Sequence, residues 1–100
     1  MKDAEKFLAR VPDELVFWCH DGRILHGMKE LGEALESMSD KTFRYHVNPE
    51  KNDFSVWVKD VIGDERLARE LARATHCAEA GRAVAKRLAF LSRQLTPRRA

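Results

Sequence analysis

Apolar residues recur with a helical period over much of the chain after residue 28. The first such stretch has the i, i+3, i+4, i+7 spacing of an amphipathic helix and contains Leu31, Ala34, Leu35 and Met38. A second stretch begins at a cap, Asn52 or Asp53, and continues to Ile62. At about 100° per residue, its apolar positions cover one face about 140° wide, formed by Phe54, Trp57, Val58, Val61 and Ile62.

Two further helices are predicted in the last third of the chain. Gly63 is placed to end the preceding helix in a left-handed conformation, and Asp64 to cap the next one. The inward side of that helix consists of Leu67, Leu71 and Ala74. Thr75 is the predicted cap of the last helix. Its narrow apolar seam contains Cys77, Ala80, Val84, Leu88, Leu91 and Leu95.

A shorter helix is predicted between these stretches, over residues 41–47. Ser39 and Asp40 supply its N-terminal cap. Its inward side holds Phe43, His46 and Val47. Residues 48–51, with the sequence Asn-Pro-Glu-Lys, are typical of a turn.

The pattern before residue 28 indicates a β-hairpin. Residues 14–20 are rich in β-branched and aromatic side chains, and Asp21-Gly22 is a signal for a two-residue turn before residues 23–26. Two strands alone are marginally stable, so one face is expected to pack on helices. The other face presents either Val16 and Trp18 or Phe17 and Cys19.

Composition agrees with a single globular domain. The chain has 100 residues, of which 44% are hydrophobic and 34% charged. The predicted fold is mainly α with a small N-terminal β-hairpin (α+β), in which about five short helices form a compact bundle packed on the hairpin. Residues 1–12 form an N-terminal helical arm, with a helix over 3–10 ended by Pro12, and residues 96–100 form a frayed tail.

The sequence predicts a cytoplasmic protein without a membrane segment. The longest uncharged apolar run, Leu15 to Cys19, is far shorter than the ~20 residues of a membrane span. The charged N-terminus lacks the apolar core of a signal peptide. Two cysteines are too few for a disulfide framework and are interpreted as free thiols.

Charge is divided unevenly along the chain. Residues 1–63 carry 9 basic and 12 acidic side chains, a balance of −3, whereas residues 64–100 carry 9 and 4, a balance of +5. This division favours an acidic partner or head-to-tail self-association. It also makes nucleic acid a possible partner, with phosphate contacts from Arg66, Arg69, Arg73, Arg82, Lys86 and Arg93. The alternative is a solvated face, because Glu65, Glu70 and Glu79 lie among these cations.

Residues 45–48 (YHVN) and 51–64 (KNDFSVWVKDVIGD) carry a family resemblance. Together they resemble a prokaryotic domain family of unknown function, found in archaea and bacteria, that is marked by a phrase close to HVNxxKNDFxxWxxDVxGDxxLA. The similarity covers roughly residues 14–74 and includes the strand, the Asp-Gly turn and the following helix. The family implies a fold but no activity.

Two interpretations of this phrase remain open. In the first, its residues cap helices, fill the core and make a turn. In the second, its polar members form a binding surface for a cation, a sugar or a basic peptide. The residues of that surface are His46, Asn48, Asp53, Trp57 and Asp60.

No motif predicts catalysis, a metal site or a cofactor. P-loop, Gly-x-Gly-x-x-Gly, His-Glu-x-x-His and Gly-x-Ser-x-Gly patterns do not occur in the sequence. The Cys19-His20 and His76-Cys77 pairs lack the spacing of zinc ligands. We therefore predict a small cytosolic, non-enzymatic interaction or regulatory domain that binds a protein partner or itself. The alternatives are nucleic-acid binding through the C-terminal helices and a ligand or metal site around His46, Asp53 and Asp60.

Overall fold

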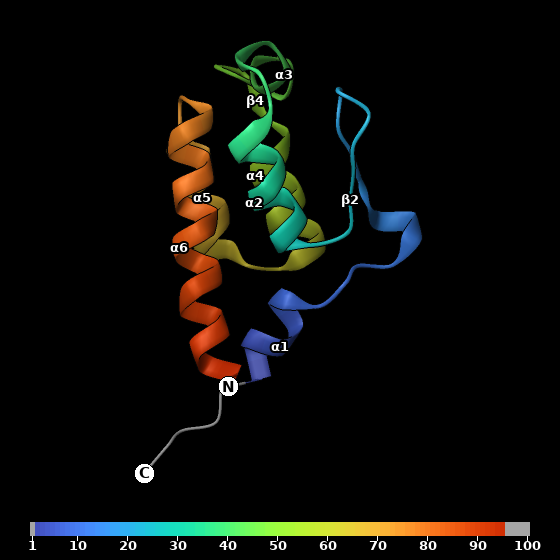
Figure 1. Cartoon of the computed structure of the whole chain (residues 1–100), viewed down its shortest axis with the longest axis vertical. Coiled ribbons are helices and arrows are strands. Elements are labelled where there is room, and N and C mark those ends of the chain that lie inside the picture. The colour runs from blue at the N-terminus through green and yellow to red at the C-terminus, as the bar shows by residue number, and fades with distance from the viewer. Residues whose placement is uncertain (1, 96–100) are drawn as a thin grey trace.

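Helices α2 (Met28–Ser37) and α6 (Cys77–Leu95) pack side by side. The structure is a computed structural model that describes residues 2–95 (Figure 1). The two helices approach closely at Gly32, where an added methyl carbon would lie 3.1 Å from Val84 Cγ1. A glycine at this position lets the two apolar stripes meet.

The other helices surround this pair. Helix α1 (Lys2–Leu8) packs on α6 and α2, and α5 (Glu65–Arg73) packs on α6 and on the segment that precedes it. The largest fully buried apolar side chains are Phe54, Met28, Leu31, Leu35, Leu67, Leu71, Val58 and Val84. The predicted helical stripes are thus confirmed as the core. In the seam of α6, Leu88 is half-buried and Leu95 is exposed.

The predicted helix up to Ile62 is not uniform. Helix α4 (Asp53–Trp57), capped by the Asn52 side chain, continues into a π-helical turn, η2 (Val58–Ile62). Gly63, with φ of 91°, ends this turn as predicted, and its N–H donates to the Val58 carbonyl at 2.7 Å. The wider π turn buries Val58 and Ile62 and leaves Val61 half-buried.

Helix caps agree with the sequence interpretation in three of four places, of which Asn52 at the start of α4 is one. Ser39 caps α3 (Asp40–His46), and Asp64 caps α5 through the Leu67 N–H at 3.1 Å. Thr75 differs, because its hydroxyl donates to Glu79 Oε1 at 3.1 Å. The Glu79 carboxylate also accepts the Thr75 N–H at 2.9 Å, so Glu79 provides the hydrogen-bond acceptor at the start of α6.

The first hairpin is shorter than predicted and its turn is one residue longer. Strands β1 (Phe17–Trp18) and β2 (Ile24–Leu25) are antiparallel, with Trp18 opposite Ile24. The Gly22 N–H donates to the Cys19 carbonyl at 3.0 Å, and Gly22 has φ of 99°. The predicted two-residue Asp21-Gly22 turn is therefore wrong, because Gly22 takes the left-handed position that closes a three-residue loop.

A second hairpin lies where only a turn was predicted. Strands β3 (Val47–Asn48) and β4 (Lys51–Asn52) are antiparallel. The Asn48 side-chain oxygen accepts the N–H groups of Glu50 and Lys51, at 2.8 and 3.0 Å. This side-chain bonding explains the turn, which is confirmed.

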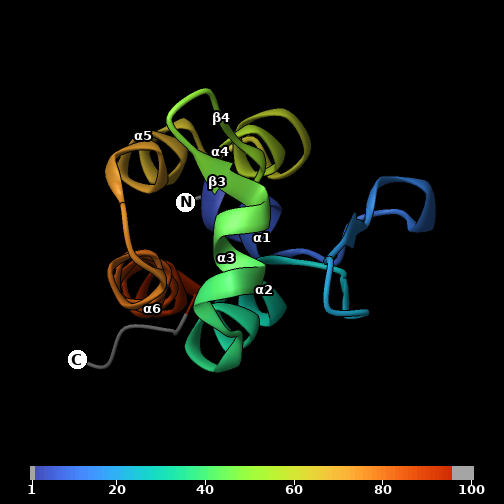
Figure 2. The same ribbon diagram turned by 90° about the horizontal axis from the view of Figure 1, so that it is seen from above.

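The fold class is confirmed: the chain is mainly helical with small β-hairpins. Its core lies between helices, whereas the β1–β2 hairpin and the 3-10 turn before it, η1 (Asp13–Leu15), stand to one side (Figures 1 and 2). The predicted frayed tail, residues 96–100, lies outside the described residues. Within residues 2–95, no helix has the length and apolar character needed to cross a bilayer.

Candidate interaction surface

The β1–β2 hairpin has one buried and one exposed face. Phe17, Cys19 and Leu25 point into the core, with exposed fractions of 8%, 6% and 2%. Trp18 is 71% exposed and Ile24 40% exposed. Of the two arrangements that the sequence left open, the structure thus has Trp18 outside and Phe17 with Cys19 inside.

Trp18 and Ile24 form a cross-strand pair, which we call the outer hairpin face. The Cys19 N–H donates to the Arg23 carbonyl at 2.9 Å, so the neighbouring Trp18–Ile24 pair is a non-hydrogen-bonded one. In such pairs the side chains stand closest together. The outer hairpin face is therefore a continuous apolar surface.

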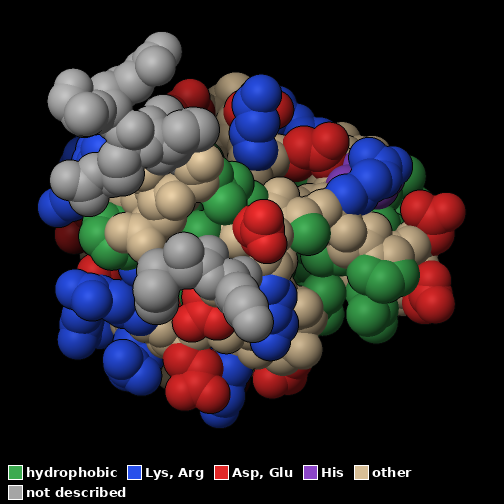
Figure 3. All heavy atoms as spheres, turned by 90° about the horizontal axis from the view of Figure 1, so that it is seen from below, with side chains coloured by type: hydrophobic (Ala, Val, Ile, Leu, Met, Phe, Trp, Pro, Cys, Tyr) green, Lys and Arg blue, Asp and Glu red, His purple; other side chains and the backbone are tan. Residues whose placement is uncertain are grey.

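The surroundings of this face are acidic. Asp13 and Glu14 are exposed in η1, and neither forms an ion pair with any residue of the described part of the chain. In the loop, Asp21 is paired with Arg23 at 3.5 Å. Viewed from below, hydrophobic and acidic side chains lie at the right-hand end of the molecule beside a group of Lys or Arg side chains, and several more Lys and Arg side chains line the left (Figure 3).

His46 holds the hairpin loop on the helical body. Its buried ring accepts the His20 N–H at Nε2, at 3.0 Å. Because Nε2 is an acceptor, Nδ1 carries the proton and donates to Asp53 Oδ2, also at 3.0 Å. Lys51 Nζ approaches the same carboxylate oxygen at 3.1 Å. This chain of hydrogen bonds links the loop, α3, β4 and α4.

Two other contacts hold the base of the hairpin. The Trp57 indole N–H donates to the Leu15 carbonyl at 2.8 Å. At the other end, the Glu30 carboxylate accepts the His26 N–H at 2.7 Å, and this backbone hydrogen bond is the main reason that the pKa of Glu30 lies below its usual value.

The inner face packs on aromatic rings. The Phe17 ring stacks on Phe54 at 5.0 Å between centroids and meets Trp57 edge to face at 5.6 Å. It also meets the His46 ring edge to face at 5.0 Å. Aromatic pairs of this geometry stabilise by about 0.5–1.5 kcal/mol beyond area burial. The hairpin is thus held as a rigid projection.

The polar residues of the family phrase mostly serve these contacts. His46, Asp53 and Trp57 lie together, but both ring nitrogens of His46 and the Trp57 N–H are already hydrogen-bonded. Asn48 orders the β3–β4 turn, and Asp60 is exposed without a side-chain hydrogen bond in the part that the structure describes. A buried imidazole with two hydrogen bonds has no lone pair free for a metal ion.

The predicted phosphate-contact residues are all exposed on the outer sides of α5 and α6, namely Arg66, Arg69, Arg73, Arg82, Lys86 and Arg93. Only Arg66 and Lys86 share a hollow.

Arg87, which the sequence interpretation left out, makes the strongest contact of these helices. Its Nε lies 2.7 Å from Oδ2 of Asp64, which is 1% exposed. No local signal marked this pair, because Asp64 stands beside the charged residues Glu65 and Arg66 in the sequence and only the fold buries it.

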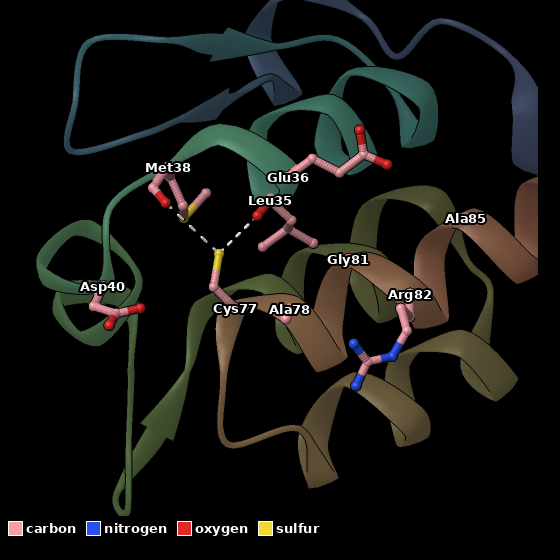
Figure 4. Close-up of a pocket in the computed structure, with 9 residues that line it drawn as sticks. All are labelled: Leu35, Glu36, Met38, Asp40, Cys77, Ala78, Gly81, Arg82 and Ala85. Atoms are coloured by element: carbon pink, nitrogen blue, oxygen red, sulfur yellow. Dashed lines mark hydrogen bonds between the residues drawn. The ribbon is translucent and has the colours of Figure 1, made fainter.

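A depression of about 410 Å³ lies where the end of α2, the start of α3 and the first turns of α6 meet (Figure 4). The Cys77 thiol points toward α2 and donates to the Leu35 carbonyl at 2.7 Å, whereas Arg82 points away. Burial, and next the nearby Asp40 charge, raise the pKa of Cys77. A raised pKa disfavours the thiolate that a nucleophile requires.

The cysteine–histidine pairs do not converge. Cys19 is buried and His20 exposed, and Cys77 is buried and His76 exposed. Over residues 2–95, no group of three or more His, Cys, Asp or Glu side chains is arranged to hold a metal ion.

Comparison of the chain with protein-family models, with curated proteins and with solved structures finds no match. The resemblance to the prokaryotic domain family stays a prediction. Function therefore has to be argued from the chemistry of the surface.

Proposed function

We propose that this chain is a small cytoplasmic interaction or regulatory domain that binds a protein partner through its outer hairpin face. The observation that carries this proposal is the 71% exposure of Trp18 on a hairpin that His46 and Trp57 fix to the body. Exposed apolar surface beside polar residues is typical of interaction sites, and tryptophan is the residue most enriched at binding hot spots.

Rigidity supports the same proposal. A side chain presented on a fixed element loses little conformational freedom on binding, so more of its contact energy appears as affinity. The fold itself does not need Trp18 outside, because the inner face already supplies Phe17, Cys19 and Leu25 to the core. Trp18 and Ile24 are thus free to serve a partner.

The proposed absence of catalysis rests on the state of the reactive groups. Burial raises the pKa of both thiols, Cys19 and Cys77, and His46 has both nitrogens in hydrogen bonds. The cytoplasmic location rests on these two free cysteines, which suit a reducing compartment.

The test is affinity purification of tagged protein from its native host, followed by mass spectrometry. Wild type is expected to retain a stoichiometric companion that Trp18→Ser loses. Val56→Ser is the matched control, because Val56 is 56% exposed on α4, outside the hairpin. A companion kept equally by Trp18→Ser and wild type would contradict the proposed surface.

Nucleic-acid binding is a second candidate. Arg82, Lys86 and Arg93 recur along one exposed stripe of α6, and α5 beside it exposes Arg66, Arg69 and Arg73. Such a face predicts binding to DNA or RNA that weakens steeply with salt, and that Arg69→Glu with Arg73→Glu abolishes. Binding that is absent at low salt in a mobility-shift assay would eliminate this candidate.

A further inference from the structure

A small hollow between α5 and α6 has the chemistry to receive a tryptophan. It measures about 160 Å³ and is lined by Arg66, Glu70, Lys86, Arg87 and Phe90. Phe90 is 44% exposed, and the Arg87 guanidinium lies 5.4 Å from its ring centroid. Cations beside an aromatic ring attract an indole, because tryptophan is the strongest cation–π acceptor among side chains.

The charges of the hollow complement those of the hairpin. Its lining has three cations and one carboxylate, and Arg66 and Lys86 have no ion pair among the described residues. The unpaired carboxylates Asp13 and Glu14 lie in η1, which directly precedes the hairpin in the chain. Complementary charge guides association and sets the orientation of the two surfaces.

The two surfaces lie on opposite sides of the molecule. In both Figure 1 and Figure 2 the hairpin stands at the right and α6 at the left, with the helical body between them. A hairpin held by His46 and Trp57 cannot reach the hollow of its own chain. The complementary partner therefore has to be another molecule.

We infer that the outer hairpin face of one copy docks into the α5–α6 hollow of a second copy, with Trp18 against Phe90 and the cations around it. This inference rests on the proposed function and names the partner as the chain itself. The contact joins two different surfaces, so each copy keeps one free hairpin and one free hollow. Such a head-to-tail contact extends into open chains unless its rotation closes a ring.

The test is the weight-average mass of the intact chain, measured by analytical ultracentrifugation up to about 1 mM, where contacts with micromolar to millimolar Kd are populated. Wild type is expected to exceed the dimer mass as concentration rises. Trp18→Ser and Phe90→Ser are each expected to remain monomeric. Higher NaCl is expected to lower the wild-type mass, because unpaired exposed charges are screened.

Mixing the two variants gives the sharpest result. Trp18→Ser keeps an intact hollow and Phe90→Ser an intact hairpin, so an equimolar mixture is expected to form dimers and stop there. A mixture that stays monomeric, when each variant retains the wild-type circular dichroism spectrum, overturns the inference. Association that persists in Trp18→Ser alone also overturns it.

Two further variants keep the test decisive if Phe90→Ser unfolds. Lys86→Glu reverses an exposed charge at the hollow and is expected to abolish association, whereas Val56→Ser leaves it unchanged. A wild-type chain that stays monomeric at 1 mM refutes self-docking. If that chain still retains a foreign companion through Trp18, the proposed interaction function survives and only its partner changes.

Discussion

The helical body and the β1–β2 hairpin are stabilised in different ways. The body has a continuous apolar core across α1, α2, α4, α5 and α6, with one buried ion pair between Asp64 and Arg87. The hairpin has strands of two residues, and His46 and Trp57 hold it at its loop and its base. Many weak contacts define the body, whereas the hairpin combines the packing of one face, with Phe17, Cys19 and Leu25, and a few directed hydrogen bonds.

Because of this difference, the stability of the fold depends on the body, whereas the position of Trp18 depends on the anchors of the hairpin. The body would keep its fold without the outer hairpin face, whereas the hairpin would lose its position without its anchors. Short two-stranded ribbons are marginal alone, so the position of Trp18 depends on the residues behind it. Stability of the body and rigidity of the hairpin should therefore respond to different substitutions.

The largest effect is expected at the ion pair of the body. Arg87→Met leaves Asp64 charged and 1% exposed, and breaking a buried pair in this way costs about 3–5 kcal/mol. Urea denaturation measures this loss of unfolding free energy. Asp64→Asn added to Arg87→Met is expected to restore part of it, because the amide oxygen can still cap Leu67. A double variant no more stable than Arg87→Met would contradict the explanation.

The hairpin anchor is expected to contribute less. His46→Phe keeps an aromatic ring against Phe17 but removes both hydrogen bonds, and leaving the His20 N–H unpaired costs about 1–3 kcal/mol. Hydrogen exchange should accelerate in residues 17–25 and remain unchanged in α2 and α6. Asp53→Asn, which still accepts from Nδ1, is the milder control. If His46→Phe accelerated hydrogen exchange equally in residues 17–25 and in α2 and α6, His46 would support the whole fold.

The alkylation rates of the two thiols allow a direct comparison of the hairpin and the body. Burial raises the pKa of Cys19 in the hairpin and of Cys77 in the body, so both alkylate slowly at neutral pH and faster as pH rises. Local opening of the hairpin should make Cys19 react about tenfold faster, equivalent to about 1.4 kcal/mol in opening free energy. Peptide mapping after timed iodoacetamide treatment measures both rates. Equal alkylation rates of Cys19 and Cys77 would indicate that the hairpin and the body open together in a single event.

The smallest effect on stability is expected at Trp18. Trp18→Ser changes a 71% exposed side chain, so the free energy of unfolding should stay within about 0.5 kcal/mol of wild type. Thermal and urea unfolding provide the measurement. A loss well above that value would mean that Trp18 packs on the body and that its exposure serves no partner.

Periodicity predicted the body well because packing there follows from residue spacing. The stripe of α2 and the cap at Asp64 could be located from sequence alone. The π turn at 58–62 could not, since residues 54–62 have the apolar spacing of a regular α-helix. The β3–β4 pairing was also missed, because two-residue strands leave no alternation to detect.

The site was harder to predict, for a different reason. His46 and Trp57, two residues of the predicted binding surface, turn their polar atoms inward to hold residues more than twenty positions away in sequence. Only the packing of the hairpin on the helices decides that Trp18 faces outward, and the sequence left open which of the two faces is exposed. The hollow beside Phe90 joins two helices, so no local pattern encodes it.

The three-residue loop after Cys19 also restricts how this chain can evolve. Paired residues on neighbouring strands share a face, and a slip of one residue moves a strand's side chains to the other face. If a lost or gained loop residue were absorbed by a one-residue slip of β2, Trp18 would lie opposite Arg23 or Leu25, whose side chains belong to the other face, and the apolar pair with Ile24 would be lost. Insertions and deletions should therefore be selected against between residues 19 and 23.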